Sequence, residues 1–202
     1  MNPAIFASLT LAFAVPAPAP ASATVTVAAG NRAGSEASAL AIMADPASVN
    51  PMAFSQVAQY LWDRGDRRQA AFWYYLWQAR TRPWVSVQGG STAQARGAIS
   101  ATLGRTINEW VASDPDSWMA LSRRAIAYER TMPLSSARPR GVTEAAWLET
   151  VERERSRYAA SFEAMSANPR FSRTSLEESR RSNGLYVGPW SDPGADLPDA
   201  WQ

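Results

Sequence analysis

The side chains that could do chemistry in this chain are carboxylates, hydroxyls and arginines, because the sequence contains no histidine, cysteine or lysine. Without histidine and cysteine, the usual zinc and copper ligand sets and the Ser-His-Asp or Cys-His nucleophile systems cannot be built. Without lysine, a Schiff base or a Ser-Lys pair is excluded as well. The chemistry that remains is carboxylate acid–base catalysis or a cation site with oxygen ligands.

The acidic residues are not spaced as a catalytic pair. Glu149 stands four positions before Arg153, which is the spacing of an ordinary ion pair on the surface of a helix. The glycines at Gly89-Gly90 and Gly184 match no phosphate-binding loop. We therefore predict no catalytic residue, no cofactor and no metal site, and we expect a protein that is not an enzyme.

Arginine and tryptophan are the residues that point to a function. All 20 basic residues are arginine, and nine residues are tryptophan; both types anchor protein interfaces. Arg82 and Trp84 are expected in a proline-containing loop, and Tyr186 and Trp190 in an irregular segment near the end of the chain. These four residues are the candidate partner-binding site. The alternative is that both segments fold back and seal the ends of helices.

Residues 1–23 predict a secretory signal peptide. An uncharged apolar run over residues 5–15 is followed by a Pro/Ala spacer and then Ala21-Ser22-Ala23, the small-x-small pattern that signal peptidase cleaves. The apolar run is too short to span a bilayer. We therefore expect an exported, soluble periplasmic protein that begins near Thr24; a disordered Ala/Pro segment is the alternative.

Charge and composition exclude further classes of partner. The formal net charge is +2 at pH 7, which makes the chain a poor nucleic-acid binder. The arginines that cluster over residues 153–157 and 170–181 are best interpreted as a solvated face with glutamate partners. No second long apolar segment follows, so the mature chain is expected to have no integral membrane segment.

Apolar periodicity predicts a single all-α domain of about six helices, and no segment favours a strand. Asn50 and Asp114 each precede a proline, as helix-capping residues do, and Asp66 is expected to cap a helix after Gly65 ends the previous one. The predicted helices are residues 35–44, 51–64, 66–81, 94–113, 115–130 and 143–168.

The predicted order along the chain is a signal peptide (1–23), a flexible lead-in (24–34), the helical domain (35–168) and an irregular C-terminal tail (169–202) packed on or near the domain. Within the tail, residues 175–181 could form a short turn of helix. Within the helical domain, residues 70–77 are eight successive apolar or aromatic residues. A helix with no polar face is buried on all sides, so this helix is predicted to be the centre of the core.

Residues 58–79 resemble one helical hairpin of the tetratricopeptide or Sel1-like class. The resemblance is carried by Tyr60-Leu61-Trp62, the Gly65-Asp66 turn, the small Ala70 and the Trp73-Tyr74 pair. It covers one hairpin, and no second copy follows at the period of roughly 34 residues that such arrays have. The resemblance implies a helical surface that binds a peptide or a protein.

These features together predict a non-enzymatic, exported protein-binding module. Its most concrete form is an immunity-type inhibitor of a toxin or cell-wall hydrolase in the periplasm. An adaptor or structural subunit of an envelope complex fits the same features. The rival from another class is a carboxylate-type cell-wall glycan hydrolase, which requires two acidic residues to converge in a Trp-lined cleft.

Overall fold

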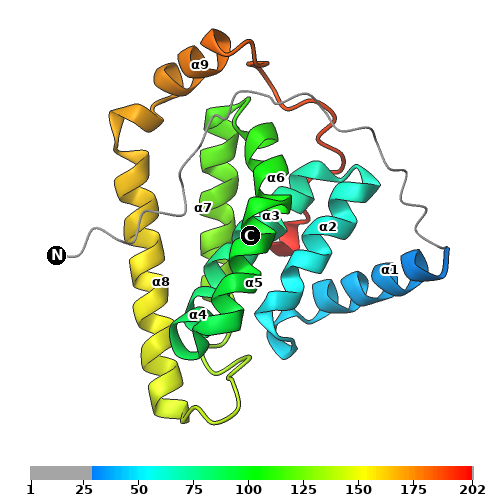
Figure 1. The fold of residues 1–202 in the computed structure, drawn as a ribbon, viewed down its shortest axis with the longest axis vertical. Helices are drawn as coiled ribbons and strands as arrows, with labels where there is room; N and C mark the ends of the chain where they lie inside the picture. Colours follow the sequence, from blue (N-terminus) through cyan, green and yellow to red (C-terminus); the bar gives the residue numbers. More distant parts are fainter. Residues whose placement is uncertain (1–28, 202) are drawn as a thin grey trace.

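The structure is a computed structural model that describes the backbone of residues 29–201 and the side chains of residues 35–201. Within that range the chain forms one all-α domain without a strand, as predicted (Figure 1). The predicted signal peptide, residues 1–23, lies outside the described residues. The α-helices are α1 (Ala29–Ala44), α2 (Phe54–Arg64), α3 (Arg67–Arg80), α4 (Arg82–Gln88), α5 (Gly90–Ala101), α6 (Leu103–Val111), α7 (Pro115–Thr131), α8 (Glu144–Ser166) and α9 (Arg173–Ser182).

Helix α3 is the centre of the core, which confirms the prediction from its apolar run. The eight side chains of residues 70–77 are at most 7% exposed, because α2, α4, α6 and α7 all pack against this helix. Trp73 lies between the rings of Phe54 and Trp201, whose centroids are 5.4 and 5.5 Å away. Helix α3 therefore connects α2, which precedes it in the chain, with α4, α6 and α7, which follow it.

Two predicted helix starts carry the side-chain cap that the sequence suggests. Asn50 accepts a hydrogen bond from the N–H of Met52, and Asp114 accepts one from the N–H of Ser117. Each of these two caps satisfies a first-turn N–H that has no partner inside the helix. At the other end of a helix, Gly65 terminates α2 in the left-handed conformation, also as predicted.

The prediction that Asp66 caps α3 is wrong. Its carboxylate binds Arg64 at 3.0 Å and accepts the N–H of Ala195 at 3.3 Å. The carbonyl of Pro193 accepts the N–H of Arg68 at 2.9 Å instead. A carbonyl from the distant C-terminal tail therefore satisfies this first-turn donor, which leaves Asp66 free to hold the tail.

The described residues contain nine α-helices rather than about six, because one predicted helix is divided in two and two further segments are helical. The helix predicted over 94–113 is divided at Thr102, whose hydroxyl bonds back to the carbonyl of Ala98 and so favours a bend. The segment 82–88, expected as a loop leading into a break, is α4, since Pro83 occupies a first-turn position that tolerates proline. The tail contains α9, which is longer than the short helical turn expected over 175–181, and α1 begins at Ala29, inside the predicted lead-in.

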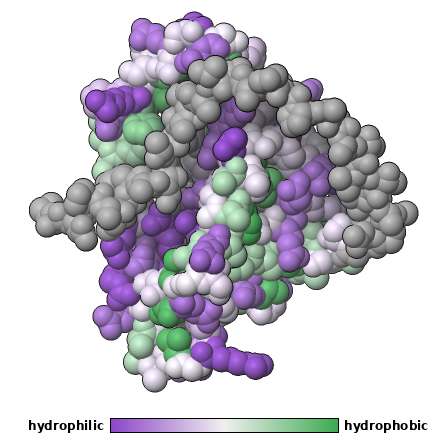
Figure 2. Space-filling view, viewed as in Figure 1, coloured by the Kyte–Doolittle hydropathy of each residue, from purple (hydrophilic) through white to green (hydrophobic). Residues whose placement is uncertain are grey.

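The helices are arranged with α8 along one edge of the domain and α1 and α2 along the other (Figure 1). Helices α4 and α5 lie between these edges, and α9 lies across one end. On the visible part of this face, hydrophilic residues gather along α8 and hydrophobic residues form a narrower band over α4 and α5 (Figure 2). In the described range, no helix combines the length and apolar composition that crossing a membrane requires.

Candidate functional site

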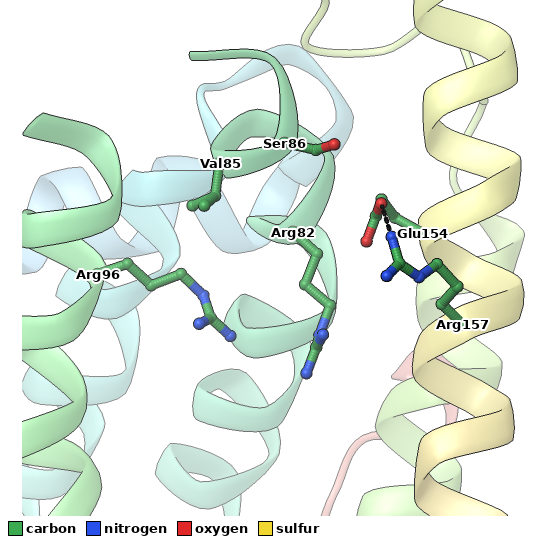
Figure 3. A pocket seen from close by; sticks show the side chains of 6 residues that line it. All are labelled: Arg82, Val85, Ser86, Arg96, Glu154 and Arg157. Carbon is green, nitrogen blue, oxygen red and sulfur yellow. Dashed lines mark hydrogen bonds and ion pairs between the residues drawn. The ribbon is translucent and has the colours of Figure 1, made fainter. Parts of the chain in front are cut away.

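A cavity of about 240 Å³ opens where α4, α5 and α8 meet (Figure 3). Its lining contains three cationic side chains and one anionic side chain, which is a formal excess of two positive charges. We call it the arginine cavity; its lining residues are Arg82, Val85, Ser86, Arg96, Glu154 and Arg157.

Arg82, in the first turn of α4, lines the cavity without a carboxylate partner in the part of the chain that the structure describes. Its guanidinium lies over the ring of Tyr158 on α8, 4.5 Å from the centroid, a favourable cation–π geometry. Its Nε is buried and has no acceptor among the described residues. A buried donor without an acceptor costs about 1–3 kcal/mol, so Arg82 is a cation that its own fold leaves unsatisfied.

Arg96 reaches the same cavity from α5 and is held only by neutral groups of the described chain. Its Nε donates to the hydroxyl of Thr81 at 3.0 Å, and its Nη2 donates to the carbonyl of Gln78 at 3.3 Å. Burial lowers the pKa of Arg96, and repulsion from Arg82 lowers it further. Figure 3 shows the two guanidinium groups directed into one space from neighbouring helices.

The opposite wall of the cavity carries an anion whose charge is already matched. Glu154 on α8 lies 3.1 Å from Arg157 and 3.7 Å from Arg153, and its side chain is 8% exposed. Glu154 faces Arg157 in Figure 3. The excess of positive charge in the cavity therefore resides on Arg82 and Arg96.

A buried ion cluster fixes the walls of the cavity relative to one another. Glu129 on α7 binds Arg80 at the end of α3 at 2.8 Å and Arg155 on α8 at 2.9 Å, and none of the three side chains is more than 7% exposed. Burial lowers the pKa of Arg80, and the charge of Glu129 opposes that effect. Because Arg80 precedes Arg82 by two positions and Arg155 follows Glu154, the cluster positions both walls.

The structure does not bring the four predicted partner-binding residues together. Arg82 lines the cavity, but Trp84 on the same helix turns away, and its indole donates to the carbonyl of Ala137 at 2.8 Å. Tyr186 and Trp190 lie in the segment that follows α9, and α9 lies at the other end of the domain from α4 (Figure 1).

Those two tail residues differ from each other in exposure. Tyr186 is 57% exposed, and its hydroxyl donates to the carbonyl of Pro189. Trp190 is half-buried; its indole donates to the carbonyl of Val111 at 3.0 Å, and its ring lies 4.8 Å from that of Trp110.

Sequence reasoning missed Arg96 as a site residue, although a signal is present. Residues 67–108 contain six arginines and no aspartate or glutamate. Neither Arg82 nor Arg96 therefore has an acidic residue three or four positions away, the spacing at which helical ion pairs form. A stretch of this length without acidic residues indicates arginines whose anionic partners, if any, come from other parts of the chain or from another molecule.

A scan against protein-family models, a search of curated proteins and a search of solved structures each gave no match. The packed hairpin of α2 and α3 is observed, but its resemblance to tetratricopeptide or Sel1-like repeats stays a prediction.

Proposed function

We propose that this protein is a non-enzymatic, exported protein-binding module whose partner docks on α4, α5 and α8. Its most concrete form is an immunity-type inhibitor that occupies a toxin or cell-wall hydrolase. The observation that supports binding is the pair Arg82 and Arg96, which face an open cavity without a carboxylate partner in the described residues. Arginine is enriched at the centres of protein interfaces, where it anchors the partner.

The chemistry of the cavity favours binding over glycan hydrolysis. Hydrolysis by carboxylates requires a pair of acidic groups flanking the bond to be cleaved. The arginine cavity has one carboxylate in its lining, Glu154, and that group is bound by Arg153 and Arg157. A single carboxylate, paired with two guanidinium groups, does not supply the two acidic groups that this reaction needs.

Capture with a sterically blocked face tests the proposal. The mature chain is immobilised and exposed to an envelope extract of the bacterium that encodes it, in parallel with Ser86→Trp and Thr174→Trp. Ser86 is exposed at the rim of the cavity, and Thr174 is exposed on α9 at the far end of the domain. We expect the wild type and Thr174→Trp to retain the same protein and Ser86→Trp to lose it at least tenfold. Equal retention by Ser86→Trp, or no protein retained by the wild type, overturns the proposal.

A further inference from the structure

We infer that the arginine cavity binds a carboxylate, held between the guanidinium groups of Arg82 and Arg96. The inference rests on the proposed function, since it names the group of the partner that enters the cavity: an aspartate or glutamate side chain. It identifies a binding site whose second residue, Arg96, the sequence alone does not reveal.

The first argument is charge. Two partly buried cations that face one space repel each other, and removal from water disfavours both of them. The charge of Arg82 lowers the pKa of Arg96 accordingly. An anion between them opposes the repulsion and compensates the desolvation, so the bound form relieves a cost that the free protein bears.

The second argument is the supply of donors. A guanidinium has five N–H donors in a fixed planar fork that matches the two oxygens of a carboxylate. Arg82 makes no hydrogen bond within the described residues, and Arg96 uses only Nε and one N–H of Nη2. Both side chains therefore keep donors for a ligand, while the contacts to Tyr158 and Thr81 hold them in place.

The third argument selects an acidic side chain over a phosphate. Val85 contributes an apolar wall to the cavity, which suits the methylene groups of an aspartate or glutamate, whereas every oxygen of a phosphate requires a polar partner. A glutamate or aspartate of a protein partner therefore fits the lining.

Calorimetric titration of the full-length mature chain with defined probes tests the inference. The probes are a hexaglutamate peptide, succinate and inorganic phosphate, each at matched ionic strength in sodium chloride. Ser86→Glu places a competing carboxylate at the rim and leaves both arginines intact, and Gln88→Glu makes the same change of charge on α4 outside the cavity lining. Arg82→Gln removes one of the two cations.

We expect saturable binding of hexaglutamate to the wild type and to Gln88→Glu, and at least tenfold weaker binding to Arg82→Gln and Ser86→Glu. Because Ser86→Glu changes an exposed residue, it keeps the test decisive if Arg82→Gln does not fold. Succinate that binds as well as hexaglutamate identifies a free dicarboxylate as a ligand of the same site. No saturable binding of either carboxylate, binding unaffected by Ser86→Glu, or tighter binding of phosphate overturns the inference.

The two proposals fail in different ways. A protein captured by the wild type and lost by Ser86→Trp, together with no carboxylate binding, contradicts the carboxylate site and leaves the protein-binding function standing. Carboxylate binding with no captured protein supports the carboxylate site and contradicts the protein-binding function.

Discussion

Arginines lie at the start of α3 and two residues beyond its end, and these two places differ in how the arginines are satisfied. At the start of α3, Arg67 lies 3.7 Å from Asp192 and donates to the carbonyl of Ser191, and Arg68 forms an ion pair with Asp196. Just beyond the other end, Arg82 faces the arginine cavity without an anionic partner in the described chain. Arginine is thus bound by the tail at the start of α3, which we call the closed end, and left without an anionic partner in the first turn of α4, among the described residues.

The closed end is built from contacts between residues more than 70 positions apart. The tail carbonyl of Pro193 meets the N–H of Arg68, and the indoles of Trp110 and Trp190 donate to the carbonyls of Ser191 and Val111. An arginine or tryptophan in the sequence therefore indicates a binding surface only where the rest of the chain leaves its side chain without a partner.

Trp73→Ala tests the burial of α3, the helix that separates the closed end from the arginine cavity. We expect it to lower the free energy of unfolding more than any other variant proposed here. Trp73 is fully buried, so its truncation removes apolar contacts and leaves a cavity. The free energy of unfolding should fall by about 3–5 kcal/mol, measured by chemical denaturation. A fall below about 1 kcal/mol contradicts the placement of Trp73 at the centre of the core.

Gly194→Ala tests the close approach of the tail to the α2–α3 turn. A Cβ at Gly194 would lie 2.6 Å from the Cα of Asp66, and the φ of Gly194 is +72°. We expect an unfolding free energy lower by about 2–3 kcal/mol, from clash and backbone strain together. Gly184→Ala is the control, since it has a similar φ of +69° and no atom within 4 Å. Equal losses in the two variants mean that the tail does not approach the turn so closely.

Trp190→Ala separates a structural tail from a binding tail. The side chain is half-buried and its indole is hydrogen-bonded to Val111, so we expect a loss of about 2 kcal/mol in unfolding free energy, less than for a fully buried tryptophan. The more exposed Tyr186→Ala should change it by less than about 0.5 kcal/mol. Normal stability of Trp190→Ala combined with lost affinity for a captured partner would make Trp190 a binding residue instead.

Arg82→Gln should have the smallest effect on stability and thereby sharpen the contrast between the two ends. The change removes the buried Nε donor that lacks an acceptor and the repulsion toward Arg96, and it forfeits the stacking on Tyr158. Because these effects have opposite signs, we expect the unfolding free energy to move by less than about 0.5 kcal/mol in either direction. Arg68→Gln, at the closed end, should cost about 0.5–1 kcal/mol. Thermal or denaturant unfolding of both variants measures the difference, and a larger cost for Arg82→Gln would show that Arg82 is a structural residue.

The sequence predicts the helices of this fold better than it predicts which distant residues contact one another. Asn50, Gly65 and Asp114 act through hydrogen bonds within a few residues, so a local pattern is enough to find them. The start of α4 is also local, but Pro83 occurs both in loops and in first helical turns, and the pattern does not separate the two.

The candidate site depends on contacts that no local pattern contains. Arg67 and Arg82 have the same side chain, yet Arg67 meets an aspartate 125 positions later, whereas Arg82 meets no carboxylate between residues 29 and 201. The stretch of residues 67–108, which contains no aspartate or glutamate, limits the candidate unpaired arginines to the few that lie within it. Only the packing of α5 and α8 beside α4 shows that Arg82 and Arg96 face one space.

The buried cluster of Arg80, Glu129 and Arg155 also fixes the register of α8. This 23-residue helix packs against α4 and α7, and sliding it by one turn would move Arg155 by about 5.4 Å along the helix axis. That shift would separate buried charges from their partners, at a cost of about 3–5 kcal/mol. Helix α8 therefore has a single register against its neighbours, and charged side chains outside the cavity lining hold the cavity wall on α8 in place.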